Sequence, residues 1–165
     1  MKWFFVLGSV VWGGLLFADA IEVNEIRLAY EVVSNEVIFT IEAPTTGWVA
    51  VGWGATTRMK DADFLIGYVT NGNHGVVEDH FGVSVTSHRR DTELGGGDNF
   101  RLIEAFENNG KTRLVIARVL NTKDTYDVPL EMEKPIDVIL AYGKIDNTKS
   151  KHVGIGKAKM ILKRK

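Results

Sequence analysis

Two side chains that can coordinate iron, a thioether and an imidazole, stand in unusual places in this chain. Met59 lies in a polar loop, although a methionine more commonly fills gaps in an apolar core. His152 opens the last predicted strand, and the residues on its face of that strand are small: Gly154, Gly156 and Ala158. A thioether and an imidazole together can ligate the iron of a haem, and this pair raises its reduction potential.

The stretch from Gly47 to Gly54 would form the opposite wall of a haem slot. Read with a period of two, it turns Val49, Val51 and Trp53 to one side. The other side is nearly bare, and its members are Trp48, Ala50, Gly52 and Gly54. Because glycine inside a strand often marks the close approach of a ligand, we expect a flat group to lie on this side.

Both proposed ligands also have a structural interpretation. Met59 can be an ordinary packing residue, and His152 can be a surface histidine at a strand edge. Three further residues, Asp79, His80 and His88, could bind a metal, but their spacing matches no standard zinc motif. The neighbourhood of these residues therefore leaves the choice between haem ligands and structural residues open.

The sequence offers little support for nucleophilic catalysis or for phosphate binding. No serine lies in a nucleophile elbow, and the run Gly95 to Gly97 precedes no predicted helix that would form a phosphate site. Arg118 has apolar neighbours and needs a carboxylate partner, which we expect to be Asp124 or Asp127. We predict no catalytic residues and no enzymatic activity.

The first residues of the 165-residue chain predict export. Lys2, an apolar run over residues 3–18 and the pattern Ala18-Asp19-Ala20 are typical of a signal peptide, here residues 1–20. An uncleaved membrane anchor is the alternative. Residues 21–165 are expected to form one secreted or periplasmic domain without stable membrane insertion.

Composition narrows the classes of function. The formal net charge of −1 argues against a nucleic-acid partner. The chain has no cysteine, which excludes a disulfide scaffold, thiol catalysis and covalent c-type haem. A haem in this protein would therefore be held non-covalently.

The positions of apolar residues predict an all-β fold. No segment has a helical period over ten or more residues, whereas about nine or ten short alternating segments are separated by turns. The polar, glycine-rich segment Gly82 to Asn99 is expected to be a functional or mobile loop. These features indicate a β-sandwich in a single domain.

An ordered set of motifs along the chain resembles a known family. The motifs are Gly47-Trp48-Val49-Ala50-Val51-Gly52-Trp53, Met59 with Ala62-Asp63, Ile66-Gly67-Tyr68, Val77-Glu78-Asp79, Asn99, Arg118 to Asp127, Val138 to Gly143, and His152 with Gly154. In this order they resemble the DOMON domain and in particular its haem-binding branch, to which the cytochrome domain of cellobiose dehydrogenase belongs. The resemblance covers roughly residues 25 to 162.

The resemblance implies an immunoglobulin-like antiparallel β-sandwich that binds one b-type haem between strands at one end. Met59 and His152 would be the axial iron ligands, and the function would be single-electron transfer. The residues expected to contact the haem are Trp48, Gly52, Tyr68 and Gly154, with Arg58 and Lys60 near its propionates. The implied partner is a redox protein, either a dehydrogenase or a membrane cytochrome.

Two other functions are compatible with this resemblance. The family also contains sugar-binding members without haem, so a carbohydrate-binding module is the main alternative. In that case the aromatic side chains of Trp48, Trp53, Tyr68 or Tyr142 would stack on sugar rings. A haem carrier or sensor with one labile ligand is the third possibility.

Overall fold

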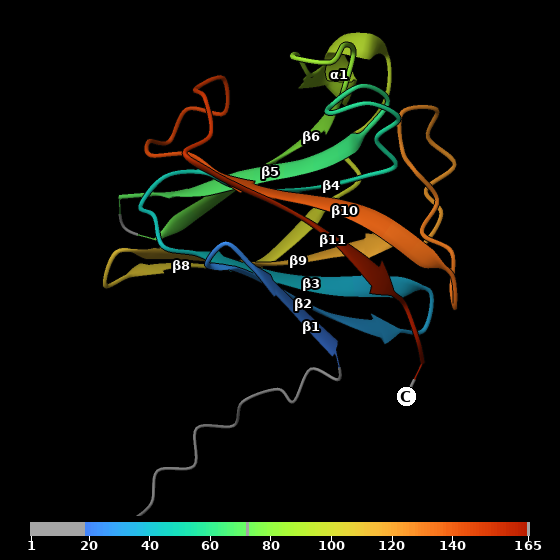
Figure 1. The fold of residues 1–165 in the computed structure, drawn as a ribbon, viewed down its shortest axis with the longest axis horizontal. Coiled ribbons are helices and arrows are strands. Elements are labelled where there is room, and N and C mark those ends of the chain that lie inside the picture. The colour runs from blue at the N-terminus through green and yellow to red at the C-terminus, as the bar shows by residue number, and fades with distance from the viewer. Residues whose placement is uncertain (1–18, 72, 165) are drawn as a thin grey trace, which may run out of the picture.

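The computed structural model of the chain describes residues 19–71 and 73–164, which form eleven strands and one short helix. The predicted signal peptide lies outside these residues except for its last two, Asp19 and Ala20, which already belong to the first strand. No helix within the described ranges is long and apolar enough to cross a membrane. Two antiparallel sheets pack face to face, as expected for a β-sandwich (Figure 1).

The lower sheet in Figure 1 has five strands in the order β1-β2-β3-β9-β8. They are β1 (Asp19–Val23), β2 (Ile26–Val33), β3 (Glu36–Ala43), β9 (Lys111–Val119) and β8 (Arg101–Asn108). Short turns join β1 to β2, β2 to β3 and β8 to β9, and the predicted Asn-Gly hairpin connects the last pair. Local turn chemistry thus accounts for most of this sheet.

The upper sheet has six strands in the order β11-β10-β4-β5-β6-β7. They are β11 (Gly154–Ile161), β10 (Pro135–Tyr142), β4 (Val49–Trp53), β5 (Asp63–Thr70), β6 (His74–Phe81) and β7 (Arg89–Arg90). The pairing of β4 with β10 brings together segments almost ninety residues apart, for example Val51 opposite Leu140. This long-range pairing places the loop after β10 over the same sheet as the loop after β4.

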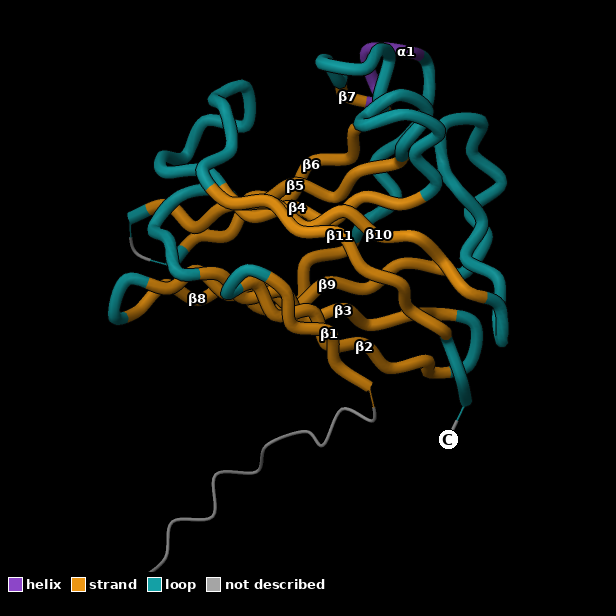
Figure 2. The backbone as a smooth tube through the Cα atoms, viewed as in Figure 1, coloured by secondary structure: helices purple, strands orange, loops and turns teal. Residues whose placement is uncertain are grey.

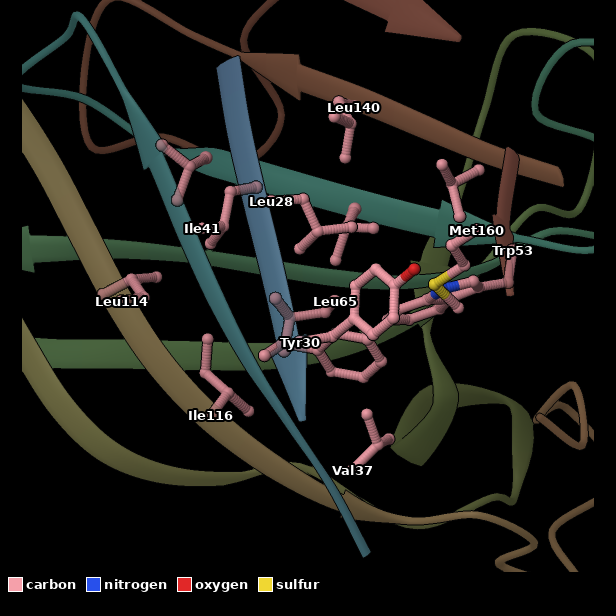
Figure 3. Packing of buried hydrophobic residues seen from close by; sticks show 14 of the residues in the cluster. Leu28, Tyr30, Val37, Ile41, Trp53, Leu65, Leu114, Ile116, Leu140 and Met160 are labelled. Atoms are coloured by element: carbon pink, nitrogen blue, oxygen red, sulfur yellow. The ribbon is translucent and has the colours of Figure 1, made fainter. Parts of the chain in front are cut away.

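The core fills the space between the sheets and confirms the predicted alternation in β4. Val49, Val51 and Trp53 all point into it and are completely buried. Trp53 packs between two other aromatic rings, with its centroid 5.1 Å from that of Phe39 and 6.0 Å from that of Phe100. Figure 3 shows part of this cluster, including Leu28, Tyr30, Ile41, Leu65, Leu114, Leu140 and Met160.

Several loops lie over the outer face of the six-stranded sheet. Figure 2 shows these teal loops above the orange strands, while other loops lie at the ends of the sandwich. The segment predicted as one long loop, residues 82–99, contains β7 and the helix α1 (Asp91–Leu94). A four-residue helix is too short to produce a detectable helical period.

Candidate functional site

A cavity of about 680 Å³ lies on the outer face of the six-stranded sheet. Its floor consists of side chains that alternate with the core residues of β4, β5 and β10, and all are apolar: Trp48, Ala50, Phe64, Ile66, Ile139 and Ala141. Loops form the walls, which include Val85, Thr86 and Ser150. The volume and the apolar lining are typical of a site for a small organic ligand.

Met59 reaches this cavity from the loop between β4 and β5. The loop is held by backbone hydrogen bonds, in which Ala62 donates to the Met59 carbonyl at 3.2 Å and Asp61 to the Gly82 carbonyl at 2.8 Å. A β-carbon at Gly82 would collide with the Met59 carbonyl oxygen. The segment after β6 therefore lies directly against the Met59 loop and fixes its backbone.

His152 lines the same cavity from the loop between β10 and β11. Trp48 anchors this loop, because its indole donates a hydrogen bond to the Ser150 hydroxyl at 2.9 Å and its carbonyl accepts one from Gly143 at 2.8 Å. The Val153 amide donates to the Tyr142 carbonyl at 2.9 Å. His152 is half-buried and precedes β11 instead of opening it, one small difference from the predicted strand.

Met59 and His152, separated by more than ninety residues in sequence, thus contribute to the walls of one cavity. The cavity lies on the outer sheet face, the side of β4 on which the sequence predicted that a flat group would lie. It does not lie between the two sheets, where the core fills the space. The physical reason is the alternation in β4 and β10, which sends the bulky side chains inward and leaves the outer face flat.

The small residues of β11 were also assigned to the wrong side. Gly154 pairs with Tyr142, and a β-carbon there would meet the tyrosine ring. A β-carbon on Gly156 would meet Val23 of β1. These small residues therefore make room for packing between the sheets, and the cavity is lined instead by Ile155 and Lys157.

The other predicted contact residues have different surroundings. Trp48 lines the cavity as expected. Gly52 lies under the ring of Phe64, which would collide with a β-carbon at that position, so its lack of a side chain serves the floor and not a ligand directly. Tyr68 packs against the edge of the floor cluster without lining the cavity, and Lys60 is exposed outside it.

The charge of the cavity was predicted from the sequence only at Arg58. Lys149, Lys151 and Lys157 also contribute to its lining, and none of the described lining residues is an aspartate or a glutamate. An apolar floor with a cationic border suits a flat apolar ligand that carries carboxylates. Lys149 and Lys151 belong to the same loop as His152, and their proximity to it in sequence was the available signal.

A second, polar cleft of about 590 Å³ adjoins the cavity and shares His88 with it. His88 Nδ1 lies 2.9 Å from His80 Nδ1, and His80 Nε2 lies 2.8 Å from a Glu78 oxygen. Burial lowers the pKa of His80, and burial together with the neighbouring His80 lowers the pKa of His88 to about 4. Both imidazoles are therefore neutral at pH 7.

The predicted cluster of Asp79, His80 and His88 is not formed. Neighbouring residues on a strand point to opposite faces, so His80 faces outward while Asp79 points into the sandwich towards Asp63 and Asp127. Arg118 does bind carboxylates, as expected. Its closer partner is Asp63 at 2.6 Å, with Asp127 at 3.7 Å, and Asp124 is not among its ion pairs.

The family follows from a comparison with known proteins. The model of the DOMON domain family matches residues 22–143, most of the chain. The chain belongs to the DOMON domain family. The match ends before His152, so the second proposed ligand lies outside the matched region.

Relatives of known sequence are much longer proteins. The chain is 31% identical over 108 residues to mouse "DBH-like monooxygenase protein 1", and the match covers 66% of the chain but 17% of the relative. The human protein of the same name is 27% identical over 115 residues, and "MOXD1 homolog 2" of Drosophila melanogaster is 25% identical over 127 residues. The chain spans less than a fifth of the length of these relatives.

Two solved structures share the fold. The cytochrome b domain of pyranose dehydrogenase from Coprinopsis cinerea superposes with a TM-score of 0.62 at 13% identity, covering 83% of this chain and 76% of that domain. The cytochrome domain of Myriococcum thermophilum cellobiose dehydrogenase gives 0.64 at 10% identity, covering 87% and 81%. At this identity the likeness concerns the fold.

Proposed function

We propose that this DOMON domain is an exported b-type cytochrome that binds one haem in the cavity of the outer sheet face and transfers single electrons. The observation that carries the proposal is that Met59 and His152 line the same cavity although they come from loops far apart in sequence. The folds of two cytochrome domains support it.

The residues of the cavity fit a haem. Its floor is apolar and flat. Ala50, Gly52 and Ala141 contribute little volume there, and the remaining floor side chains are aromatic rings and isoleucines. Met59 and His152 are the soft and borderline ligands that suit haem iron. The four cationic side chains of the border would neutralise two propionates, and none of the lining residues in the described ranges carries a carboxylate that would repel them.

The protein's residues would have three tasks in electron transfer. A bound haem would supply one-electron redox chemistry. Met59 and His152 would hold the iron from both loops in each redox state, which keeps the structural change on reduction small. The apolar floor would exclude water from the ring, and the thioether would raise the reduction potential relative to two imidazoles.

The carbohydrate alternative loses most of its stacking platforms. Trp53 is completely buried in the core, and Trp48 is 5% exposed in the cavity floor. Tyr142 packs over Gly154 towards the core cluster. Only Tyr68, which is half-buried, remains of the four aromatic residues expected to bind sugars.

Absorption spectra of single variants test the ligand assignment. Wild-type protein expressed with haem available should show sharp α and β bands on reduction and a shifted Soret band. Met59→Leu should lose the six-coordinate, low-spin spectrum because leucine offers no donor, and His152→Ala should bind haem weakly or not at all. The proposal therefore predicts that neither Met59→Leu nor His152→Ala has the low-spin spectrum of the wild type.

Matched variants control for general effects on the fold. Met132→Leu and His74→Ala change the same residue types at positions that do not line the cavity, and His74 is exposed. Both should keep the wild-type spectrum. If Met59→Leu and His152→Ala have the spectrum of the wild type, the ligand assignment is wrong; if colourless wild-type protein takes up no haem and binds glycans, the carbohydrate function replaces it.

A further inference from the structure

A group of acidic residues lies away from the cavity, where α1 meets the loop between β9 and β10. Asp91 is the first residue of α1, and Asp124 and Asp127 belong to the loop. One carboxylate oxygen of each residue lies within 4.8 Å of the others. The three side chains thus converge from two segments that are about thirty residues apart in sequence.

Two of these carboxylates are buried without a hydrogen-bond donor. Asp91 is completely buried, and neither of its carboxylate oxygens accepts a hydrogen bond from any residue that the structure describes. Asp127 is 8% exposed, and its oxygens also lack hydrogen bonds, with Arg118 3.7 Å away. A buried carboxylate without a partner is strongly disfavoured, so the group requires a cation or protons.

The neighbouring buried carboxylates of Asp63 and Asp79 each have at least one hydrogen-bond donor in the protein. Asp63 accepts hydrogen bonds from Arg118 at 2.6 Å and from the Val128 amide at 2.9 Å. Asp79 accepts one from the Asn99 amide at 2.9 Å. No cationic side chain within the described ranges forms an ion pair with Asp91. Among the three residues of the group, Asp91 is therefore the one with neither a hydrogen-bond donor nor a cationic partner in the described part of the chain.

We propose that Asp91, Asp124 and Asp127 bind a calcium ion that ties α1 to the loop between β9 and β10. All donors are carboxylate oxygens, which calcium prefers, and they come from irregular segments that can adapt to its variable coordination. Ligands bound to calcium at 2.3–2.6 Å can be up to about 5 Å apart across the ion, which agrees with the separation within 4.8 Å.

The backbone around Asp124 supports a built site. Its oxygens accept hydrogen bonds from the Tyr126 amide at 2.9 Å and the Gly97 amide at 2.8 Å, which fix the carboxylate while leaving lone pairs free. Tyr126 in turn donates its hydroxyl proton to the Leu94 carbonyl at 2.9 Å, at the end of α1. The calcium site would thus complete a set of contacts between the same two segments, independently of haem.

Protons are the competing way to neutralise the group. Burial and the nearby carboxylates of Asp63, Asp127 and Asp124 raise the pKa of Asp91 to about 7. If protons alone served, replacing Asp91 by its neutral isostere would stabilise the protein equally with and without calcium. If calcium binds, the same replacement should remove the response to calcium.

Terbium luminescence on the full chain tests the site directly, because Tyr126 adjoins Asp127 and can sensitise a bound lanthanide. After treatment with EDTA, terbium should bind saturably and calcium should displace it. Calcium at about a hundred times its dissociation constant should raise the melting temperature by on the order of 5 °C. Tyr126→Phe should dim the terbium emission without abolishing the thermal response to calcium.

Charge-neutral variants decide between the outcomes. Asp91→Asn and Asp124→Asn should each weaken calcium binding by about tenfold or more, and the half-buried Asp124 provides a second variant if Asp91→Asn does not fold. The control Asp137→Asn, exposed and paired with Lys159, should bind calcium like the wild type. Equal melting temperatures of the wild type in calcium and in EDTA, or equal binding by Asp91→Asn, Asp124→Asn and the control, would overturn the proposal.

Discussion

Arg118 is the most deeply buried cation of the described chain, and its replacement by methionine should be costly. Its side chain is completely buried, donates to Asp63 at 2.6 Å and to the Val128 carbonyl at 2.7 Å, and lies 3.7 Å from Asp127. The guanidinium carbon also lies 5.8 Å from the ring centre of Trp53. Methionine would retain much of the volume but none of these hydrogen bonds or the charge.

The magnitude follows from what Arg118→Met leaves behind. Breaking a buried ion pair by removing one partner costs about 3–5 kcal/mol, because the remaining charge is buried and unpaired. For a domain of this size, that loss lowers the melting temperature by roughly 6–20 °C. Urea unfolding followed by tryptophan fluorescence gives the free energy, and calorimetry gives the melting temperature.

An exposed ion pair provides the matched control. Arg101 binds Glu36 at 2.9 Å, but the two side chains are 61% and 40% exposed. Arg101→Met should therefore lose at most about 1 kcal/mol. If Arg118→Met unfolds at the same urea concentration as Arg101→Met, the buried ion pair is not a major source of stability and the reasoning fails.

Three further predictions concern charge, packing and the cavity. Burial and the Asp63 carboxylate raise the pKa of Asp79 to about 9, so only the native state holds this proton at neutral pH. In EDTA, the free energy of unfolding should therefore fall by about 2 kcal/mol as the pH rises from about 7 to about 9. Gly156→Val should cost about 1–3 kcal/mol in urea unfolding because its side chain would meet Val23. Trp48→Phe should weaken haem binding in a spectroscopic titration, because it removes the hydrogen bond to the loop that carries His152.

Each of these has an outcome that contradicts it. Asp79→Asn should flatten the pH profile, because asparagine resembles the protonated acid, and an identical slope in the variant would assign the effect to another group. The contribution of Asp79 is fully present below the unfolded pKa of about 4 and is lost by about pH 9. Gly156→Val with wild-type stability would mean that β1 and β11 can separate freely. Unchanged haem affinity in Trp48→Phe would show that the anchored loop does not position a ligand.

Much of the fold could be predicted because the strands of a sandwich have two distinct faces. The alternation of Val49, Val51 and Trp53 with small residues correctly divided β4 into a core side and a flat side. In β11 the same rule failed, because small residues can make room for an opposing side chain as well as for a ligand. Tyr142 over Gly154 is a long-range contact that the local pattern does not reveal.

The site could be predicted only where a residue type was unusual for its surroundings. Met59 was conspicuous in a polar loop, and it does line the cavity. His88 was not predicted to line this cavity, because its approach to the cavity depends on the path of residues 82–90 over the sheet. Asp63 was likewise missed as the partner of Arg118, since the pair joins different sheets and is 55 positions apart.

Titration of the wild-type protein with haem tests the central claim most directly. If Met59 and His152 both face the ligand, one equivalent of haem should bind and give a six-coordinate, low-spin spectrum in the oxidised and the reduced state. The reduction potential should exceed that of a Met59→His variant, which offers two imidazoles. Failure to bind haem, or a wild-type spectrum and potential that Met59→His leaves unchanged, would contradict the account.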